Sequence, residues 1–476
     1  MTQRTAETAA PRQKADIAEQ PQLTVEAEVA ATEQHLPRLD NAPEMTRGAL
    51  VHTPGRGDTM PGLVRRFLPA SSYMRGSELE AAIRAANPGV PAVYLKAGIP
   101  LQIPSLDAPT REHPLGIAKD FEVRAIYLTG IMAGSARGLE LVRRWRSVGG
   151  NAVVFDIKDS DGVVNIPFTH ELNVRSPRAP MIRNLAKYTH WLHEQGMVAI
   201  GRVAIFRDER MAVQHPELAI QSRRNSGAWR ENGKQVWVDP SRREVQEFNL
   251  ELARLAAQAG VDEIQFDYVR FPAEGDQGDA RFAFESERPN GRRSDVITDF
   301  VARAHREIKP LGVLFSLDVF GVVAWQRPVD IAALGQDIPR MAEHCDVLSP
   351  MIYPSHFFGM DGYAMPGDAP EHFIGRSMDR FREITAGSGV VLRPWLQAFG
   401  WRTKTYSPEY VQVQVKVARE KHGVGFLLWN ARNDYGYPYT AMSGMQREPG
   451  RFFRGDEVAG ERSRTARLVP ASQRQE

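Results

Sequence analysis

Three aspartates interrupt apolar, β-branched runs at corresponding places in the chain. Asp156 lies in AVVFDIK, Asp267 in EIQFDYVRF and Asp318 in LFSLDVFG. A carboxylate in such a run costs several kcal/mol when it is buried without a partner. Each aspartate alone is explained by a salt bridge, for example between Asp267 and either Arg270 or Arg202. Together the three favour a functional cluster, because carboxylates with perturbed pKa values gather at active sites.

Two carboxylates that flank a polar cleft are what hydrolysis of a glycosidic bond requires, one as acid and one as nucleophile or base. Asp267 and Asp318 belong to neighbouring runs, and adjacent strands lie about 4.8 Å apart. That spacing puts them within reach of the roughly 5–5.5 Å separation of a retaining enzyme. The sequence leaves an inverting pair open. By contrast, we expect salt bridges for Asp159, Asp161 and Asp208, which lie in polar, loop-like runs.

These aspartates belong to a regular succession of apolar runs and amphipathic segments. The eight runs are Val123–Gly130, Ala152–Lys158, Met197–Phe206, Glu263–Phe271, Leu314–Gly321, Val347–Pro354, Val391–Phe399 and Gly425–Ala431. Helical patterns such as Arg243–Ala259 and Ser294–Ile308 lie between them, with apolar residues at i, i+3, i+4 and i+7. Apolar strands that alternate with helices predict an α/β fold with a parallel sheet, and eight of them predict a (β/α)8 TIM barrel. A doubly wound open sheet is the alternative, but no G-x-G-x-x-G turn follows the first run.

Catalytic groups of a barrel come from the C-terminal ends of its strands and the loops after them. Besides the three aspartates, several polar and aromatic side chains are expected there as substrate-binding residues: Arg202, Tyr268, Arg270, Tyr353, His356, Trp395, Gln397, Trp429 and Asn430. The arginines would tune the carboxylates, and the aromatic rings could stack on sugar faces. The other polar groups would position sugar hydroxyls.

Composition narrows the class of protein. The 476-residue chain is 42% hydrophobic and 25% charged, and its net charge of +2 argues against a nucleic-acid binder. No run reaches the roughly 18–20 apolar residues of a membrane span, and no apolar N-terminal segment marks a signal peptide. The single Cys345 excludes an internal disulfide and a cysteine-based zinc cluster. His190 and His193 lack a carboxylate motif beside them, so we expect no metal and no organic cofactor.

Composition also predicts how the chain is divided. Residues 1–48 and 447–476 are polar and low in aromatics, which is typical of disordered tails. A small module covers residues 50–106, and a linker through Pro109 and Pro114 joins it to the barrel at residues 121–443.

Several segments together resemble the "putative glycoside hydrolase" family of bacterial (β/α)8 barrels, formerly a domain of unknown function. They run in order from about residue 123 to 435: NAVVFDIKDSDG, GRVAIFRDERMA, WVDP, EIQFDYVRFP, LDVFG, LGQDI, DVLSPMIYPSHF, RPWLQAF and LLWNA. The resemblance implies a glycosidase in which Asp267, at the end of the fourth strand, is nucleophile or base. We take Asp318 as the acid and Asp156 as the reserve.

The small module resembles a LysM repeat. Its pattern is a strand, a turn at Gly57, Asp58 and Thr59, two short helices that end at Asn87-Pro88, and a closing strand. Gly57 and Asp58 suit a tight turn and a helix cap, and the proline ends a helix. LysM repeats bind glycans that contain N-acetylglucosamine, such as peptidoglycan or chitin. The resemblance therefore implies a glycan-binding module whose site residues are Gly57, Asp58, Thr59 and Asn87. A plain βααβ spacer is the alternative.

Taken together, these features predict a glycoside hydrolase that acts on a cell-envelope polysaccharide and is targeted by a LysM-like module. A cell-envelope or extracellular location would follow from that module. A transglycosylase would use the same residues, and a non-catalytic glycan-binding or envelope scaffold protein is the alternative from another class. The feature that separates them is whether Asp267 and Asp318 converge across a cleft or are closed off by arginine bridges.

Overall fold

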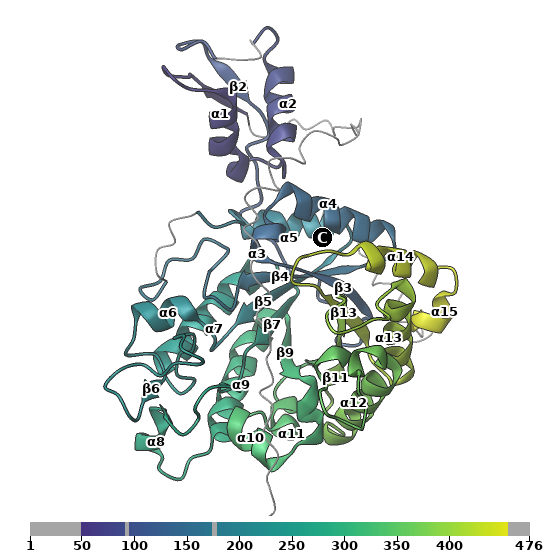
Figure 1. The fold of residues 1–476 in the computed structure, drawn as a ribbon. Helices are drawn as coiled ribbons and strands as arrows, with labels where there is room; N and C mark the ends of the chain where they lie inside the picture. Colours follow the sequence, from purple (N-terminus) through teal and green to yellow (C-terminus); the bar gives the residue numbers. More distant parts are fainter. Residues whose placement is uncertain (1–48, 91–94, 174–178, 456–476) are drawn as a thin grey trace, which may run out of the picture. The chain divides into compact units, whose positions relative to one another are not determined.

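The computed structural model of this chain describes residues 49–90, 95–173 and 179–455, and its largest part is a closed parallel barrel (Figure 1). Its strands are β3 (Val123–Leu128), β4 (Ala152–Lys158), β5 (Val198–Ala204), β7 (Glu263–Asp267), β9 (Leu314–Phe320), β10 (Val347–Ile352), β11 (Val391–Leu392), β12 (Trp395–Gln397) and β13 (Gly425–Trp429). Neighbouring strands pair in parallel in chain order, and the pairing of β13 with β3 and of β9 with β10 closes the ring. The predicted (β/α)8 barrel is confirmed.

The seventh strand position is divided in two. β11 and β12 both pair with β10, on either side of Arg393 and Pro394. The proline has no N–H to donate, which interrupts the ladder at this point. The eight predicted runs therefore correspond to eight strand positions in the barrel.

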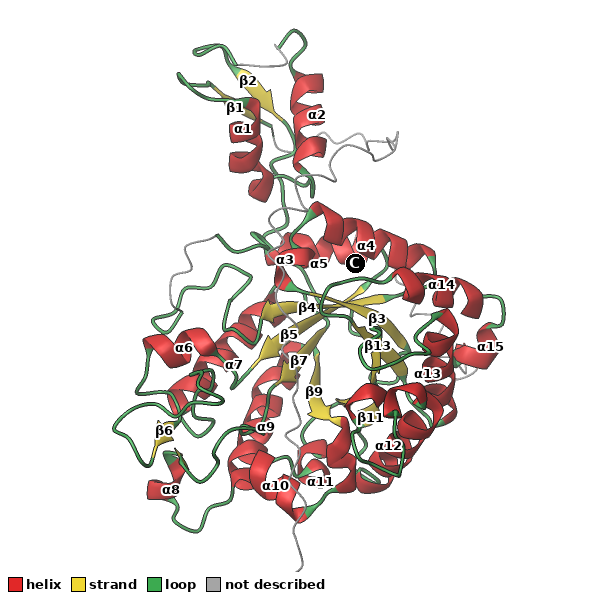
Figure 2. Ribbon diagram, in the orientation of Figure 1, coloured by secondary structure: helices red, strands yellow, loops and turns green. Residues whose placement is uncertain are grey.

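Helices surround the strands (Figure 2). They are α3 (Gly130–Ala133), α4 (Ala136–Ser147), α5 (Leu185–Glu194), α6 (Glu209–Gln214), α7 (Arg243–Gln258), α8 (Phe284–Glu287), α9 (Arg293–Ile308), α10 (Pro328–Leu334), α11 (Ile338–Ala342), α12 (Pro370–Ile384), α13 (Pro408–Glu420), α14 (Gly436–Met445) and α15 (Pro449–Phe452). The amphipathic patterns predicted for α7 and α9 match their observed bounds to within one residue at each end. A two-residue pair, β6 (Gln221–Ser222) and β8 (Ala280–Arg281), joins the loops after β5 and β7.

Side chains of the strands are buried on both faces, because alternate residues point inward and outward. In β4, Val153 and Phe155 pack in the core between strands and helices, whereas Ala152 and Val154 belong to a separate cluster inside the barrel. Asp156 continues the inward set. The strand period therefore aims this carboxylate into the interior at the C-terminal end of β4.

The same alternation holds in β7 and β9. Phe266 and Leu317 pack outward in the larger core, so the inward positions are those of Asp267 and Asp318, one residue later in each strand. Deeper in the barrel, Glu263 accepts a hydrogen bond from Arg393 at 2.6 Å, with both side chains fully buried. The inward positions of β7 are thus polar along the whole strand, at Glu263, Gln265 and Asp267.

The small N-terminal part has its own core. β1 (Leu50–His52) pairs antiparallel with β2 (Leu101–Ile103), and α1 (Met60–Phe67) and α2 (Gly76–Ala86) lie between them in the chain. A separate cluster of buried apolar side chains holds these elements together. The order βααβ is the one predicted, while the LysM identity stays a prediction.

The two predicted tails have different outcomes. Residues 1–48 and 456–476 lie outside the described residues. The described part of the predicted tail from residue 447 is folded, because Pro449–Phe452 form α15 and both Phe452 and Phe453 are buried. Arg419 donates to the carbonyl of Phe453 at 2.9 Å, which holds this segment on the barrel. No helix in the described parts of the chain is long and apolar enough to cross a membrane.

Candidate active site

One arginine collects the three predicted carboxylates at the C-terminal ends of the strands. Nη1 of Arg202 donates to Oδ1 of Asp156 at 2.5 Å, and Nη2 donates to Oδ2 of Asp267 at 2.6 Å. Nε of the same guanidinium lies 3.2 Å from that oxygen of Asp267 and 3.8 Å from Oδ2 of Asp318. Since both oxygens lie so close to one nitrogen, they are at most about 7 Å apart. This limit includes the roughly 5–5.5 Å separation of retaining glycosidases.

All three carboxylates of the cluster are buried, but to different degrees. Asp156 and Asp318 are each 1% exposed, whereas Asp267 is 7% exposed. Burial would lower the pKa of Arg202, but the charges of Asp156 and Asp267 raise it well above its usual value. Arg202 is therefore a permanent cation in the middle of the site.

Asp318 is buried with only one of its two oxygens hydrogen-bonded. Its Oδ1 accepts a hydrogen bond from Nε1 of Trp395 at 2.7 Å, while its buried Oδ2 has no hydrogen-bond partner. Burial, followed by the negative charge of Asp267, raises the pKa of Asp318 well above its ordinary value. Both effects favour the protonated form of Asp318.

Asp156 is held on both sides. Its Oδ2 accepts a hydrogen bond from the hydroxyl of Tyr127 at 2.5 Å, and Arg202 donates to its other oxygen. Burial raises the pKa of Asp156, and the charge of Arg202 opposes this rise. The sequence analysis missed Tyr127, although it has the inward parity of β3, shared with Val123 and Ala125.

The backbone leaves the strand sharply after Asp267. Tyr268 has φ +54°, a left-handed conformation that few residues with a side chain adopt. Its N–H donates to Oδ1 of Asp267 at 2.5 Å. The turn therefore fixes one oxygen of the carboxylate while Arg202 fixes the other, and strained backbone of this kind is often found at active sites.

The predicted aromatic residues line the same end of the barrel. Trp429 stacks on Tyr127 with ring centroids 4.2 Å apart and meets Trp395 edge-on at 5.7 Å. Trp395 is fully buried, so its indole serves Asp318 instead of presenting a free face. Tyr353 is buried as well, and burial together with the charge of Asp318 raises its pKa well above the usual value.

Arg270 lies apart from the carboxylates. Its guanidinium packs on the rings of Phe320, Trp237 and Tyr268 at 4.3, 4.8 and 5.4 Å, and its Nη1 donates to the carbonyl of Phe271. Of the two arginines considered as partners of Asp267, Arg202 is the one that makes the bridge.

Gln397 and Asn430 form hydrogen bonds within the loops. Gln397 donates to Thr403 Oγ1 at 2.9 Å and accepts from the N–H of Ser355 at 3.2 Å. Asn430 donates to the carbonyl of Ala398 at 2.7 Å. Both residues tie adjacent strand-end loops together.

His356 lies among aromatic rings on the loop after β10. Its Nδ1 is 3.2 Å from Oγ of Ser355. Protein atoms around the imidazole, followed by the charge of Arg402, lower the pKa of His356 to about 4. This imidazole is therefore neutral at physiological pH.

The salt bridges predicted for the loop aspartates are largely present. Asp208 pairs with the fully buried Lys158 at 2.7 Å, and Asp161 lies 3.6 Å from Arg207. Asp159 instead accepts hydrogen bonds from two backbone N–H groups, and burial, followed by the charge of Asp156, raises its pKa to about 7.

The candidate residues of the small module hold its own backbone. Gly57 has φ +90°, and Thr59 caps α1 by accepting the N–H of Gly62 at 3.2 Å. Asp58 accepts the N–H of Gly55 at 2.9 Å. Asn87 ends α2 and exchanges two hydrogen bonds, of 2.7 and 2.8 Å, with the backbone of β2.

Arg202 occupies the centre of the carboxylate cluster. In the described ranges, no group of three or more His, Cys, Asp and Glu side chains is arranged to hold a metal ion.

Comparisons with known proteins identify the family of the barrel. Residues 125–435 match the family described as "Putative glycosyl hydrolase domain". The glycoside hydrolase domain of PgaB (BpsB) from Bordetella bronchiseptica is similar in fold, with a TM-score of 0.50 and 15% identity over 67% of this chain and 99% of that one. A hypothetical protein from Ruminiclostridium thermocellum is 32% identical over 41% of this chain and 97% of its own, with a TM-score of 0.36. No curated protein matches.

The family match begins in the first barrel strand and ends beyond the eighth, so it contains Arg202 and the three carboxylates. The chain belongs to this family of putative glycosyl hydrolase domains.

Proposed function

We propose that the barrel hydrolyses glycosidic bonds of a polysaccharide with Asp267 as nucleophile or base and Asp318 as acid. The observation that carries this proposal is the unlike hydrogen bonding of two carboxyl groups beside one guanidinium. Arg202 donates two hydrogen bonds to Oδ2 of Asp267, which stabilise a carboxylate there, while burial and an unpartnered Oδ2 favour a proton on Asp318. Paired groups whose environments drive their protonation states apart are the usual basis of acid and base roles.

The remaining candidate residues have supporting roles in this proposal. Trp395 orients the carboxyl group of Asp318 through its indole N–H. Asp156 and Tyr127 hold Arg202 in place and do not contact the reacting bond. Trp429, which is half-buried, offers the ring face on which a sugar can stack.

The glycan is proposed to be a cell-envelope polysaccharide, with peptidoglycan or another N-acetylglucosamine-containing polymer as the first candidate. The support for this part is the βααβ order of the N-terminal module and its resemblance to LysM repeats. Such a module would keep the barrel on its polymer. With such a module, the proposed location is the cell envelope or the outside of the cell.

The test is product release from purified peptidoglycan, chitin and a panel of α- and β-glucans, read by mass spectrometry. The native protein is compared with Asp267→Asn and Asp318→Asn. Asp299→Asn is the matched control, because Asp299 is an exposed carboxylate paired with Arg288 at 3.1 Å on the outer helices. Soluble oligosaccharides made by the native protein and the control, and lost in both site variants, are the expected result.

One observation favours the alternative of a non-catalytic glycan-binding or scaffold protein. Arg202 bridges Asp156 and Asp267, so two of the three carboxylates are already neutralised within the protein. Binding of a glycan without any product, unchanged by Asp267→Asn, would establish that alternative and overturn the hydrolase.

A further inference from the structure

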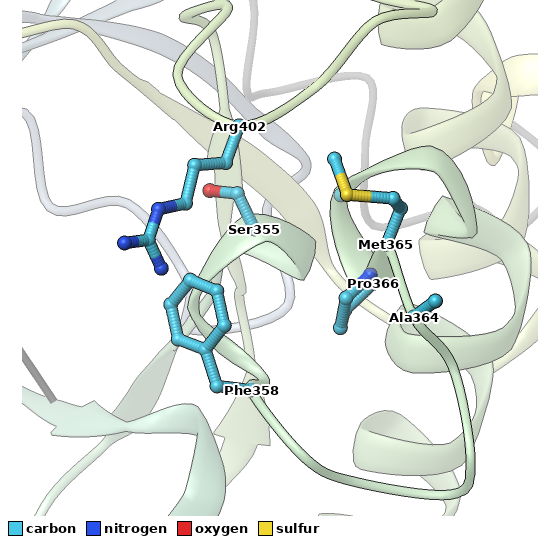
Figure 3. Close-up of a pocket in the computed structure, with 7 residues that line it drawn as sticks. Ser355, Phe358, Ala364, Met365, Pro366 and Arg402 are labelled. Atoms are coloured by element: carbon cyan, nitrogen blue, oxygen red, sulfur yellow. The ribbon is translucent and has the colours of Figure 1, made fainter. Parts of the chain in front are cut away.

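A hollow of about 250 Å³ lies between the loops that follow β10 and β12 (Figure 3). Its lining residues are Ser355, Phe358, Ala364, Met365, Pro366, Gly367 and Arg402. Arg402, Ser355 and Phe358 lie on one side and face Ala364, Met365 and Pro366 across it. The volume is slightly below the range of about 300–1,000 Å³ typical of small-molecule sites, which suits a single sugar unit.

The hollow holds a positive charge on an aromatic platform. The guanidinium of Arg402 lies over the ring of Phe358 at 4.1 Å and over that of Trp401 at 4.6 Å. Arg402 is exposed and has a left-handed backbone with φ +49°. Throughout residues 49–90, 95–173 and 179–455, no carboxylate lies within ion-pair distance of this guanidinium.

Two carboxylates in the surrounding loops have other partners. Asp361 pairs with His372 at 2.8 Å and lies 3.9 Å from Arg376. Asp368 accepts hydrogen bonds from the backbone of Lys404 and from Thr405. The charge of Arg402 is therefore not neutralised by either of them.

The walls of the hollow are fixed before any ligand arrives. Gln397 joins them, since it accepts from Ser355 N–H at 3.2 Å and donates to Thr403 at 2.9 Å. Gly367 packs so tightly that an added Cβ would meet the carbonyl oxygen of Arg402 at 2.2 Å. A preorganised wall of this kind lowers the entropy lost on binding.

A row of rings joins the hollow to the carboxylate cluster. Tyr353 belongs to the same buried cluster as Trp395, the partner of Asp318, and its ring centroid lies 5.5 Å from that of His356. His356 in turn lies 5.1 Å from Trp401, the ring on which Arg402 packs. Two exposed apolar side chains, Phe358 and Met365, extend this surface at the hollow.

From these contacts we propose that the hollow is a subsite for a carboxylated sugar unit. Arg402 binds the carboxylate, and the rings of Phe358 and Trp401 hold the guanidinium in place. The proposal rests on the function proposed above, and it narrows the substrate to an acidic glycan. The guanidinium of Arg402 has no carboxylate partner among the described residues, is held by stacking and lies beside a sugar-sized hollow. Such a group is suited to bind a carboxylate through two charge-assisted hydrogen bonds. The carboxylate has two sources in glycans, a uronic acid or the lactyl ether of muramic acid, and the two share this chemistry.

The test is calorimetric titration of the full chain in an Asp318→Asn background, which keeps each ligand intact. The first pair of probes is trigalacturonate and its carboxyl-reduced form. The second pair is the N-acetylglucosamine–N-acetylmuramic acid disaccharide and di-N-acetylchitobiose. Each is measured with and without Arg402→Met, with Lys404→Met as the matched control, because Lys404 is an exposed cation of the same loop that does not line the hollow.

In at least one pair, the carboxylated probe is expected to bind about tenfold more tightly than its neutral counterpart. Arg402→Met removes that preference and Lys404→Met keeps it, as expected for the loss of one charge-assisted interaction. The pair that responds identifies the source of the carboxylate. No preference in either pair, or an equal preference in Arg402→Met with an unchanged melting temperature, overturns the subsite.

Failure of the subsite and failure of the hydrolase are distinguishable. If native protein and Arg402→Met, both with Asp318 intact, hydrolyse a neutral glycan equally and neither prefers a carboxylated probe, the subsite is wrong and the roles of Asp267 and Asp318 stand. If binding depends on Arg402 but no glycan is cleaved, the subsite stands and the hydrolase is wrong.

Discussion

Replacing Arg202 by methionine tests the carboxylate cluster most directly, because one guanidinium serves three acidic side chains. It donates to Asp156 at 2.5 Å and to Asp267 at 2.6 Å, and lies 3.8 Å from Asp318. Methionine keeps an apolar stem and removes the charge. Breaking a buried ion pair by removing one partner costs about 3–5 kcal/mol. At about 2 °C per kcal/mol for a large domain, the melting temperature at pH 8 should fall by roughly 6–10 °C.

The size of this loss should depend on pH in one direction. Without Arg202, the buried carboxyl groups of the folded variant bind protons more tightly than the unfolded chain does. The variant therefore loses stability as pH rises above the value of about 3.9 of an unfolded aspartate. The difference from the native protein should be largest near pH 8 and shrink towards pH 4.

Calorimetric melts of both proteins at pH 4, 6 and 8 measure this difference. Arg288→Met is the control, because Arg288 forms an exposed pair with Asp299, and such pairs contribute less than about 1 kcal/mol. The reasoning about the cluster is refuted if Arg202→Met melts like this control at pH 8. It is also refuted if its deficit is the same at pH 4 and pH 8.

Three further predictions concern other parts of the barrel. Trp395→Phe removes the N–H that favours the charged form of Asp318, which raises the pKa of that carboxyl group. The alkaline limb of the pH profile of kcat/KM should therefore move to higher pH, and an unmoved limb would contradict this. Burial opposes the charging of His193, but the hydrogen bonds that its imidazole donates to Asp262 and Glu112 raise its pKa to about 9. The stability contributed by the ion pair of His193 and Asp262 is complete below about pH 6.5 and is lost as pH rises through about 9. His193→Gln should therefore flatten the decline of melting temperature with pH, and an unchanged slope would count against this pair. Gly367→Ala forces a Cβ to within 2.2 Å of a backbone oxygen, so overpacking of about 1–3 kcal/mol should lower the melting temperature by roughly 2–6 °C; an unchanged melting temperature would show that the loop moves freely.

The sequence was sufficient to predict the barrel and the members of its carboxylate cluster, for a physical reason. Strands covered on both faces consist almost entirely of apolar residues, so a single aspartate near the end of each run is conspicuous. The alternation of side chains then decides its direction. Asp156, Asp267 and Asp318 all take inward positions of their strands, which is why three aspartates far apart in the chain meet at one guanidinium.

The partner of Asp267 could not be chosen from the sequence, because the choice depends on one backbone turn. Arg202 faces inward from β5, where it lies opposite Asp156 in register. Arg270 follows Tyr268, whose left-handed φ of +54° redirects the chain. Its guanidinium consequently packs among aromatic rings. No periodicity in the sequence signals that a tyrosine adopts this conformation.

The choice of acid between Asp318 and Asp156 follows from hydrogen bonding, since burial raises the pKa of both. Asp156 accepts hydrogen bonds at both oxygens, from Tyr127 and from Arg202, so a proton placed on it would break one of them. Asp318 accepts one hydrogen bond at Oδ1, and its buried Oδ2 has no partner. A proton on that oxygen turns an unsatisfied acceptor into a donor, the form in which a general acid gives its proton to a glycosidic oxygen. We therefore propose Asp318 as the general acid and Asp156 as a residue that positions Arg202.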